Sequence, residues 1–338
     1  MLGQEAVLIR LSDLPDTVRK ELERIVFLFH RHCPPVISLM LVGGFAKGEG
    51  RIDPKGEPEN DYDLLIVWKS ARSFLLNFHS YRRLKVVLSQ TVQTPVDIIS
   101  LFASDFKRLK PTLFLYEAQQ AHLLLSGRDC FAKAPFLSPQ AISAFDQWTL
   151  FSNRIVCWLQ SYPQQSRYDH ESAYCRWVLL QWVKAVEAMV IFRLLKKKEL
   201  PVMAHAKMTR ILDLCPDGLA GIVNAARRIK EDGWMPAGSD YQKLWWQMGP
   251  LFLTDYQDAK AAAQSTPGWT RFLLTERLRR VLKSGRFRPF MPDAPLLYAV
   301  EDTPVWHAFR KKTVQDWYET RGYELTRKTV AWALGMDE

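Results

Sequence analysis

The sequence has 338 residues, of which 48% are hydrophobic and 24% charged, and its formal net charge at pH 7 is +10. This length and apolar content exclude a disordered chain and predict two globular domains. The five cysteines are odd in number and widely scattered, which excludes a disulfide framework and a zinc site built from CxxC pairs.

The first 130 residues alternate between helical and extended patterns. Ser12, Asp13 and Pro15 form a cap and first turn, which predicts a helix from there to about Cys33. Short apolar runs rich in β-forming residues predict three strands, with a helix between the last two. The expected strands are residues 37–42, 62–68 and 95–102, and the helix is at about 70–90.

After Gly127 the pattern changes to long stretches with helical periodicity, separated by Pro and Gly. The helices are expected at about residues 138–161, 170–199, 218–231, 239–264, 269–284 and 304–334. Eleven of the twelve tryptophans lie in this half, and we expect them to pack between helices rather than to stack on bases. The sequence therefore predicts a first domain at residues 1–130 and an all-helical, substrate-binding or regulatory domain at residues 137–338.

The positive charge is concentrated in the second half. Residues 131–338 hold 29 Lys and Arg against 21 Asp and Glu, whereas residues 1–130 hold 17 against 15. The densest part is residues 271–290, where seven basic side chains accompany the single acid Glu276. This segment predicts a basic amphipathic helix, with two interpretations: a solvated helix face, or a surface that binds phosphate or RNA.

Neither the N-terminal residues nor the most hydrophobic internal stretch predicts a membrane protein. The N-terminus lacks the basic head and sustained apolar core of a signal peptide. Residues 177–195 form the most hydrophobic stretch, but four polar or charged side chains interrupt it, which favours a buried helix. We therefore expect a cytoplasmic protein without a membrane partner.

Three carboxylates fall on two of the predicted strands. Asp61 and Asp63 are two residues apart on an extended chain, so both side chains project from one face, while Leu64 and Ile66 fill the other. Asp97 lies inside an apolar run on the next strand, where a carboxylate needs a partner. Oxygen ligands of this kind suit Mg²⁺ or Mn²⁺, and three carboxylates can bridge two such ions about 3.5–4 Å apart.

Gly43 and Gly44 end the first predicted strand and open what we expect to be a short helix. The free N–H groups of such a turn face the phosphates of a nucleotide. The carboxylates and the glycines therefore both point to phosphate chemistry.

Residues 41–101 resemble the signature of the DNA polymerase β-type nucleotidyltransferase superfamily. The family pattern is a hydrophobic residue, Gly, then Gly or Ser, a spacer, and Asp-hydrophobic-Asp-hydrophobic, followed by a third Asp on a later strand. The matching residues here are Val42-Gly43-Gly44, Asp61-Tyr62-Asp63-Leu64 and Asp97. The resemblance implies an α+β fold in which a polymerase β-like core, a small mixed sheet with helices, precedes an all-α domain.

Two departures from the family pattern bear on phosphate binding. The spacer from Phe45 to Asn60 has 16 residues, somewhat more than is usual, which implies a longer loop at the mouth of the site. Gly44 replaces a serine whose hydroxyl often touches the triphosphate. Phosphate binding is therefore expected to depend on Gly43, Gly44, Lys47 and basic residues of the helical half.

The resemblance also implies a reaction. An acceptor hydroxyl would attack the α-phosphorus of a nucleoside triphosphate, and pyrophosphate would leave. Asp61 and Asp63 would hold both metal ions, while Asp97 would complete one ion site and accept the proton of the attacking oxygen. The nucleobase and the oligomeric state stay open.

Several acceptors remain alternatives. A net charge of +10 favours a polyanion such as tRNA or another RNA over a cationic aminoglycoside antibiotic. AMP transfer to a protein or small molecule, and synthesis of a nucleotide second messenger, leave no motif that distinguishes them here.

A different class of function is a non-catalytic regulator, as when a nucleotidyltransferase-like fold acts as an antitoxin beside a helical HEPN-type ribonuclease. Such antitoxins are near-minimal domains, and the complete carboxylate set argues against lost catalysis. No histidine of the helical half follows an Arg at the spacing that the ribonuclease requires, which disfavours a fusion of the two.

Overall fold

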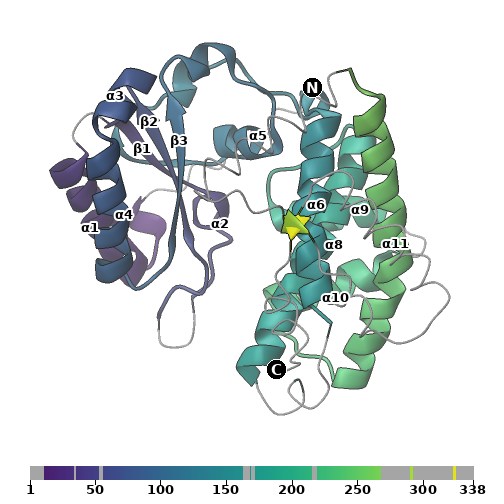
Figure 1. Ribbon diagram of the computed structural model, residues 1–338. Helices are drawn as coiled ribbons and strands as arrows, with labels where there is room; N and C mark the ends of the chain where they lie inside the picture. Colours follow the sequence, from purple (N-terminus) through teal and green to yellow (C-terminus); the bar gives the residue numbers. More distant parts are fainter. Residues whose placement is uncertain are drawn as a thin grey trace. The chain divides into compact units, whose positions relative to one another are not determined.

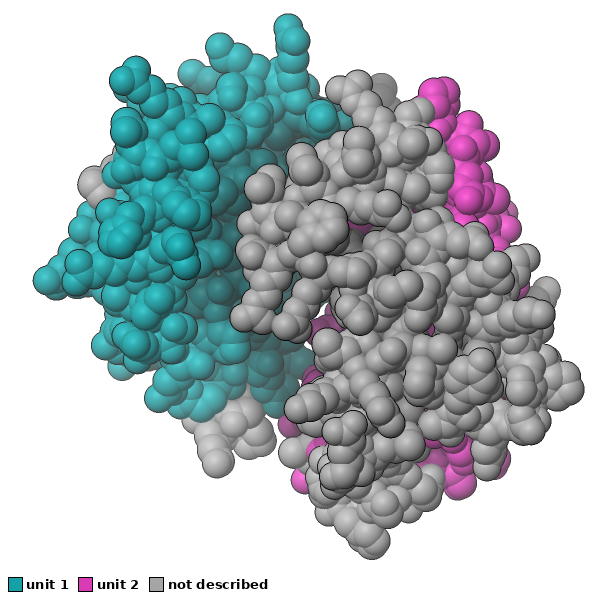
Figure 2. Space-filling view, viewed as in Figure 1, with its two compact units in different colours: residues 1–142, 200–206 teal, residues 143–199, 207–338 magenta. Residues whose placement is uncertain are grey.

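The computed structural model describes most of the chain, which divides into two compact units (Figure 2). The described residues are 11–33, 36–52, 56–162, 168, 172–214, 219–267, 290–291 and 323–324. Unit 1 consists of Met1–Ile142 and Leu200–Ala206, and unit 2 consists of Ser143–Glu199 and Lys207–Glu338. The protein is a mixed α+β protein, with a small four-stranded sheet in unit 1 (Figure 1).

The sheet of unit 1 has the strand order β3-β2-β1-β4. Its strands are β1 (Val36–Val42), β2 (Tyr62–Trp68), β3 (Val96–Phe102) and β4 (Leu123–Gly127). β1 is antiparallel to both β2 and β4, whereas β2 is parallel to β3. The parallel pair requires a crossover connection, which α3 (Ala71–Leu76) and α4 (Phe78–Thr91) provide.

One face of this sheet forms a hydrophobic core with α1 (Asp16–His32) and α4. Leu64 and Ile66 project into that core, as the alternation along β2 predicts. Leu65 and Val67 project from the other face and are also fully buried. Because β2 is buried on both faces, its sequence is a continuous apolar run rather than an alternating one.

The three predicted strands are confirmed to within one residue at each end. The helix predicted at 70–90 is two helices, because the chain breaks at Asn77, whose side-chain amide donates to the Ser73 carbonyl at 2.8 Å. α5 (Leu113–Gln120) and β4 are not among the elements predicted from the sequence. The remaining short elements are α2 (Gly43–Ala46) and 3-10 helices at Leu11–Asp13, Asp105–Arg108, Phe131–Lys133 and Pro139–Ala141.

Helices dominate the second half of the chain. They are α6 (Ala144–Gln160), α8 (Ser172–Lys196), α9 (Ala204–Leu214), α10 (Ala220–Glu231) and α11 (Gly238–Ser265). α8 packs against α6, α10 and α11. Its apolar residues are distributed around the helix, as expected for one that is covered on several sides.

Tryptophans form much of the core of unit 2, as predicted. Trp148, Trp158, Trp182 and Trp245 are fully buried. The rings of Trp158 and Trp245 stack with their centroids 4.9 Å apart, joining α6 to α11. These side chains are therefore packing residues and not a surface for stacking bases.

The prediction of an all-helical second half is wrong at two short strands, β5 (Phe290–Met291) and β6 (Tyr323–Glu324), which pair in parallel. β5 lies between two predicted helices, where Pro289 and Pro292 disfavour a helix, whereas β6 lies inside the helix predicted at 304–334, which is therefore wrong at Tyr323–Glu324. Several predictions fall outside the described residues. These are the helix at 269–284, residues 271–289 of the basic segment, and the helix at 304–334 apart from residues 323–324. Within the described part of the chain, no helix is both long and apolar enough to cross a membrane.

A buried ion pair joins two helices of unit 2. The Arg193 Nε lies 2.6 Å from the Asp255 Oδ2, and the Asp255 side chain is only 6% exposed. Burial raises the pKa of Asp255, while Arg193 opposes that rise. The guanidinium is therefore what keeps this carboxylate charged inside the helical bundle.

We expect Arg193→Met to destabilise unit 2 by about 3–5 kcal/mol at pH 7, because it leaves a buried charge without its partner. Because burial raises the folded-state pKa of Asp255, its carboxyl takes up a proton as the pH falls and no longer carries a buried charge. The loss of stability in Arg193→Met should therefore be smaller at pH 5 than at pH 7. Urea unfolding followed by the fluorescence of the buried tryptophans measures both effects. The double variant Arg193→Met/Asp255→Met should recover most of the loss; equal stability of the single variant and wild type would contradict the prediction.

Candidate functional site

The three predicted aspartates come together at the end of the sheet where β2 and β3 begin. Asp61 directly precedes β2, Asp63 is the second residue of β2, and Asp97 is the second residue of β3. The parallel register pairs Asp63 with Asp97, and one carboxylate oxygen of each aspartate lies within 4.8 Å of the others. Asp61 and Asp97 are exposed and Asp63 is half-buried, so an ion in solvent has access to the cluster.

Strand alternation explains why these carboxylates share a face. Val96 and Ile98 pack against the core formed with α1 and α4, so Asp97 between them projects from the opposite face, as Asp63 does. Three carboxylates this close repel one another unless a cation lies between them. Hard oxygen donors of this number and charge suit Mg²⁺ or Mn²⁺.

Gly43 lies against Asp63 at the end of β1. Its φ angle is +70°, and a Cβ atom there would fall 2.0 Å from the Asp63 Oδ2. Backbone conformation and contact therefore both require glycine at this position. At Gly44, by contrast, the nearest atom to a Cβ would be the Gly50 nitrogen at 4.0 Å, so a side chain fits there.

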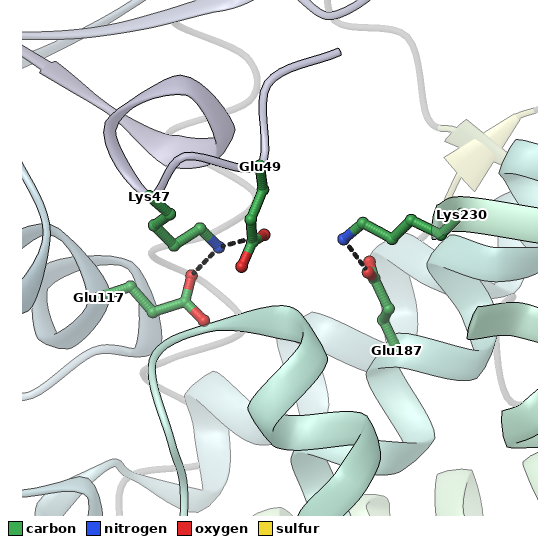
Figure 3. A network of polar contacts seen from close by, with 5 residues as sticks. All are labelled: Lys47, Glu49, Glu117, Glu187 and Lys230. Atoms are coloured by element: carbon green, nitrogen blue, oxygen red, sulfur yellow. Dashed lines mark hydrogen bonds and ion pairs between the residues drawn. The ribbon is translucent and has the colours of Figure 1, made fainter. Parts of the chain in front are cut away.

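Lys47 follows α2 and is held by two carboxylates (Figure 3). Its Nζ lies 3.6 Å from the Glu49 Oε2 and 3.4 Å from the Glu117 Oε2, and Glu117 comes from α5. Figure 3 also shows Lys230 paired with Glu187, which links α10 to α8 within unit 2. The Lys230 Nζ lies 2.6 Å from the Glu187 Oε1. The charge of Lys47 is therefore compensated, and a phosphate would have to compete with carboxylates for it.

Glu21 on α1 accepts three hydrogen bonds from the segments that carry the aspartates. Its Oε2 accepts from the Tyr62 hydroxyl at 2.9 Å and the Thr94 hydroxyl at 2.7 Å, and its Oε1 accepts from the Gln93 N–H at 3.0 Å. Burial, together with the hydrogen bond to Glu21, raises the pKa of Tyr62, so its hydroxyl keeps the proton it donates. These contacts could not be predicted from the sequence, because the partners lie 41 to 73 positions from Glu21 and no local pattern links them to it.

Comparison with known proteins adds no family name to this site. No protein-family model matches the sequence, and a search of curated proteins found no match. The site is defined by the clustered carboxylates, the glycine against Asp63 and the hydrogen bonds of Glu21.

The two neighbouring glycines give a matched pair of variants. We expect Gly43→Ala to cost about 1–3 kcal/mol of stability, because it combines backbone strain with a clash at Asp63. Gly44→Ala should be neutral or slightly stabilising, since the site has room and alanine favours a helix. Urea denaturation of both variants measures the difference; equal effects would show that the contact with Asp63 carries no constraint.

Proposed function

We propose that unit 1 is a metal-dependent nucleotidyltransferase with a polymerase β-like core, which transfers a nucleoside monophosphate from a nucleoside triphosphate to an acceptor hydroxyl. The observation that carries this proposal is the cluster of Asp61, Asp63 and Asp97, with oxygens within 4.8 Å of one another. The Gly43-Gly44 turn beside Asp63 and the mixed order of the strands support it.

The donor set fits divalent cations. Asp61, Asp63 and Asp97 would hold Mg²⁺ or Mn²⁺, which, when bound, supplies charge stabilisation for the transferring phosphoryl group and lowers the pKa of the acceptor hydroxyl. The acceptor oxygen would form a bond to the α-phosphorus, and the bond from that phosphorus to the oxygen of the leaving pyrophosphate would break. Asp97, which is exposed, would accept the proton of the acceptor hydroxyl on its carboxylate.

The acceptor that we favour is RNA, tRNA included. The net charge of +10 attracts a polyanion and repels a cationic antibiotic. The excess of basic residues lies after residue 130, in the part of the chain that follows the candidate site. The helical half is therefore where we propose that the RNA backbone binds.

Asp63→Asn and Asp97→Asn should each lower transfer by at least about 100-fold, because each removes a charged ligand from the cluster. The measurement is incorporation of label from each α-³²P nucleoside triphosphate into total RNA, with Mg²⁺ or Mn²⁺ present. Glu23→Gln, an exposed acid on α1, is the matched control and should retain full activity.

If the label appears on protein or in a small product, the proposal of nucleotidyl transfer stands, but the proposal that RNA is the acceptor is rejected. Equal activity of Asp63→Asn and wild type would reject the proposed site. No transfer of any nucleotide to any acceptor would reject the enzyme assignment in favour of a regulatory role.

Glu117→Gln tests the role of Lys47. If Lys47 binds the triphosphate, loss of one competing carboxylate should lower the KM for the nucleotide by about threefold to tenfold, equivalent to about 1 kcal/mol. Lys47→Met should raise that KM. An unchanged KM in both variants would show that Lys47 has a structural role with Glu49 and Glu117 and does not contact the nucleotide.

A further inference from the structure

A single carboxylate on α1 holds the beginnings of both strands that carry the aspartates. Glu21 contacts Tyr62, which lies between Asp61 and Asp63. It also contacts Gln93 and Thr94, in the turn that leads into β3. The same side chain therefore connects the two segments whose relative position sets the distance between the aspartates.

The hydrogen bonds of Glu21 restrict movement of the start of β2 relative to the turn before β3. Tyr62 is fully buried and Thr94 is 5% exposed, so neither hydroxyl has ready access to water as a substitute partner. Hydrogen bonds to an ionised carboxylate are stronger than those between neutral groups. The backbone adds a fourth bond between the same segments, from the Tyr62 N–H to the Pro95 carbonyl at 2.9 Å.

Glu21 does not lie on the same face of the sheet as the cluster. Tyr62 packs in the core formed with α1 and α4, whereas the neighbouring Asp63 projects from the opposite face. Glu21 would therefore act on the cluster through the backbone of Tyr62 and of the turn before β3. A strand shift of one residue is about 3.3 Å and would reverse the faces, which is enough to separate the carboxylates.

We propose that Glu21 is a positioning residue for the metal site, which keeps the starts of β2 and β3 in the alignment that lets Asp61, Asp63 and Asp97 bind one ion together. This inference rests on the proposed function. It assigns to α1, which supplies no ligand of the cluster, control over the affinity of that cluster for a divalent cation.

Substitution of Glu21 should therefore weaken metal binding even where the chain stays folded. Residues that orient metal ligands typically contribute about 10-fold to 100-fold to metal affinity. We expect Glu21→Ala to weaken Mn²⁺ binding within that range. Glu21→Gln should stay within about threefold of wild type, because its Oε1 can accept from Gln93 while its amide donates to the two hydroxyls.

The experiment is a titration of the full-length protein with Mn²⁺ alone, in which electron paramagnetic resonance measures the free ion. Asp63→Asn defines binding that does not involve the cluster. Leu28→Ala, which removes a buried core side chain of α1 away from the Glu21 contacts, is the control for a general loss of stability. Thermal unfolding of each variant sets a temperature at which all of them are folded.

The expected result is weakened binding in Glu21→Ala, with near wild-type binding in Glu21→Gln and Leu28→Ala. Wild-type affinity in Glu21→Ala, or an equal loss in Leu28→Ala, would overturn the positioning role and leave the proposed function intact. If the wild-type protein binds Mn²⁺ no more tightly than Asp63→Asn does, the metal site itself is overturned.

A second variant applies if Glu21→Ala does not fold. Tyr62→Phe/Thr94→Val removes two of the three donors and leaves the carboxylate in place. We expect a loss of Mn²⁺ affinity of at least about threefold in this double variant. Wild-type affinity there would overturn the proposal as directly as it would in Glu21→Ala.

Discussion

The position of β2 between one antiparallel and one parallel neighbour is the constraint on which the candidate site depends. In the β1-β2 register Val42 pairs with Asp63, and in the β2-β3 register Asp63 pairs with Asp97. Val42 at the end of β1, Asp63 and Asp97 therefore lie in one row across three strands, and Asp61 directly precedes β2. A slip of one residue would turn Tyr62 out of the core formed with α1 and α4 and would turn Asp63 into it, so the cost of burying a carboxylate stabilises this register.

The same row explains which parts of the site could be read from the sequence. Apolar runs fixed the three strands, and the spacing of Asp61 and Asp63 placed both on one face without knowledge of any partner. Gly43 was singled out for its N–H group, but the structure gives a further reason for glycine, because a side chain would collide with Asp63. That contact depends on strand pairing, which the local pattern does not contain.

Long-range contacts account for what the sequence analysis missed. Glu21 resembles any other acid on an amphipathic helix until α1 is packed on the sheet, and Glu117 lies on a helix that was not predicted at all. The unpredicted α5 has four apolar or aromatic residues followed by mostly polar ones, over only eight positions, a length at which helix and loop patterns are difficult to distinguish. Glu117, one of the two partners of Lys47, was consequently absent from the sequence-based description of the site.

The charge around the candidate site gives a physical reason why the proposed transfer would require a metal ion. The whole chain is basic, yet the cluster of Asp61, Asp63 and Asp97 is acidic, and Lys47, which follows the α2 turn beginning at Gly43, is compensated by Glu49 and Glu117. A nucleoside triphosphate that approached these carboxylates alone would meet like charge, whereas one that arrived with divalent cations would bring charge opposite to that of the carboxylates. The long-range field of the chain would attract the anion, and the local field would admit it only together with its metal ions.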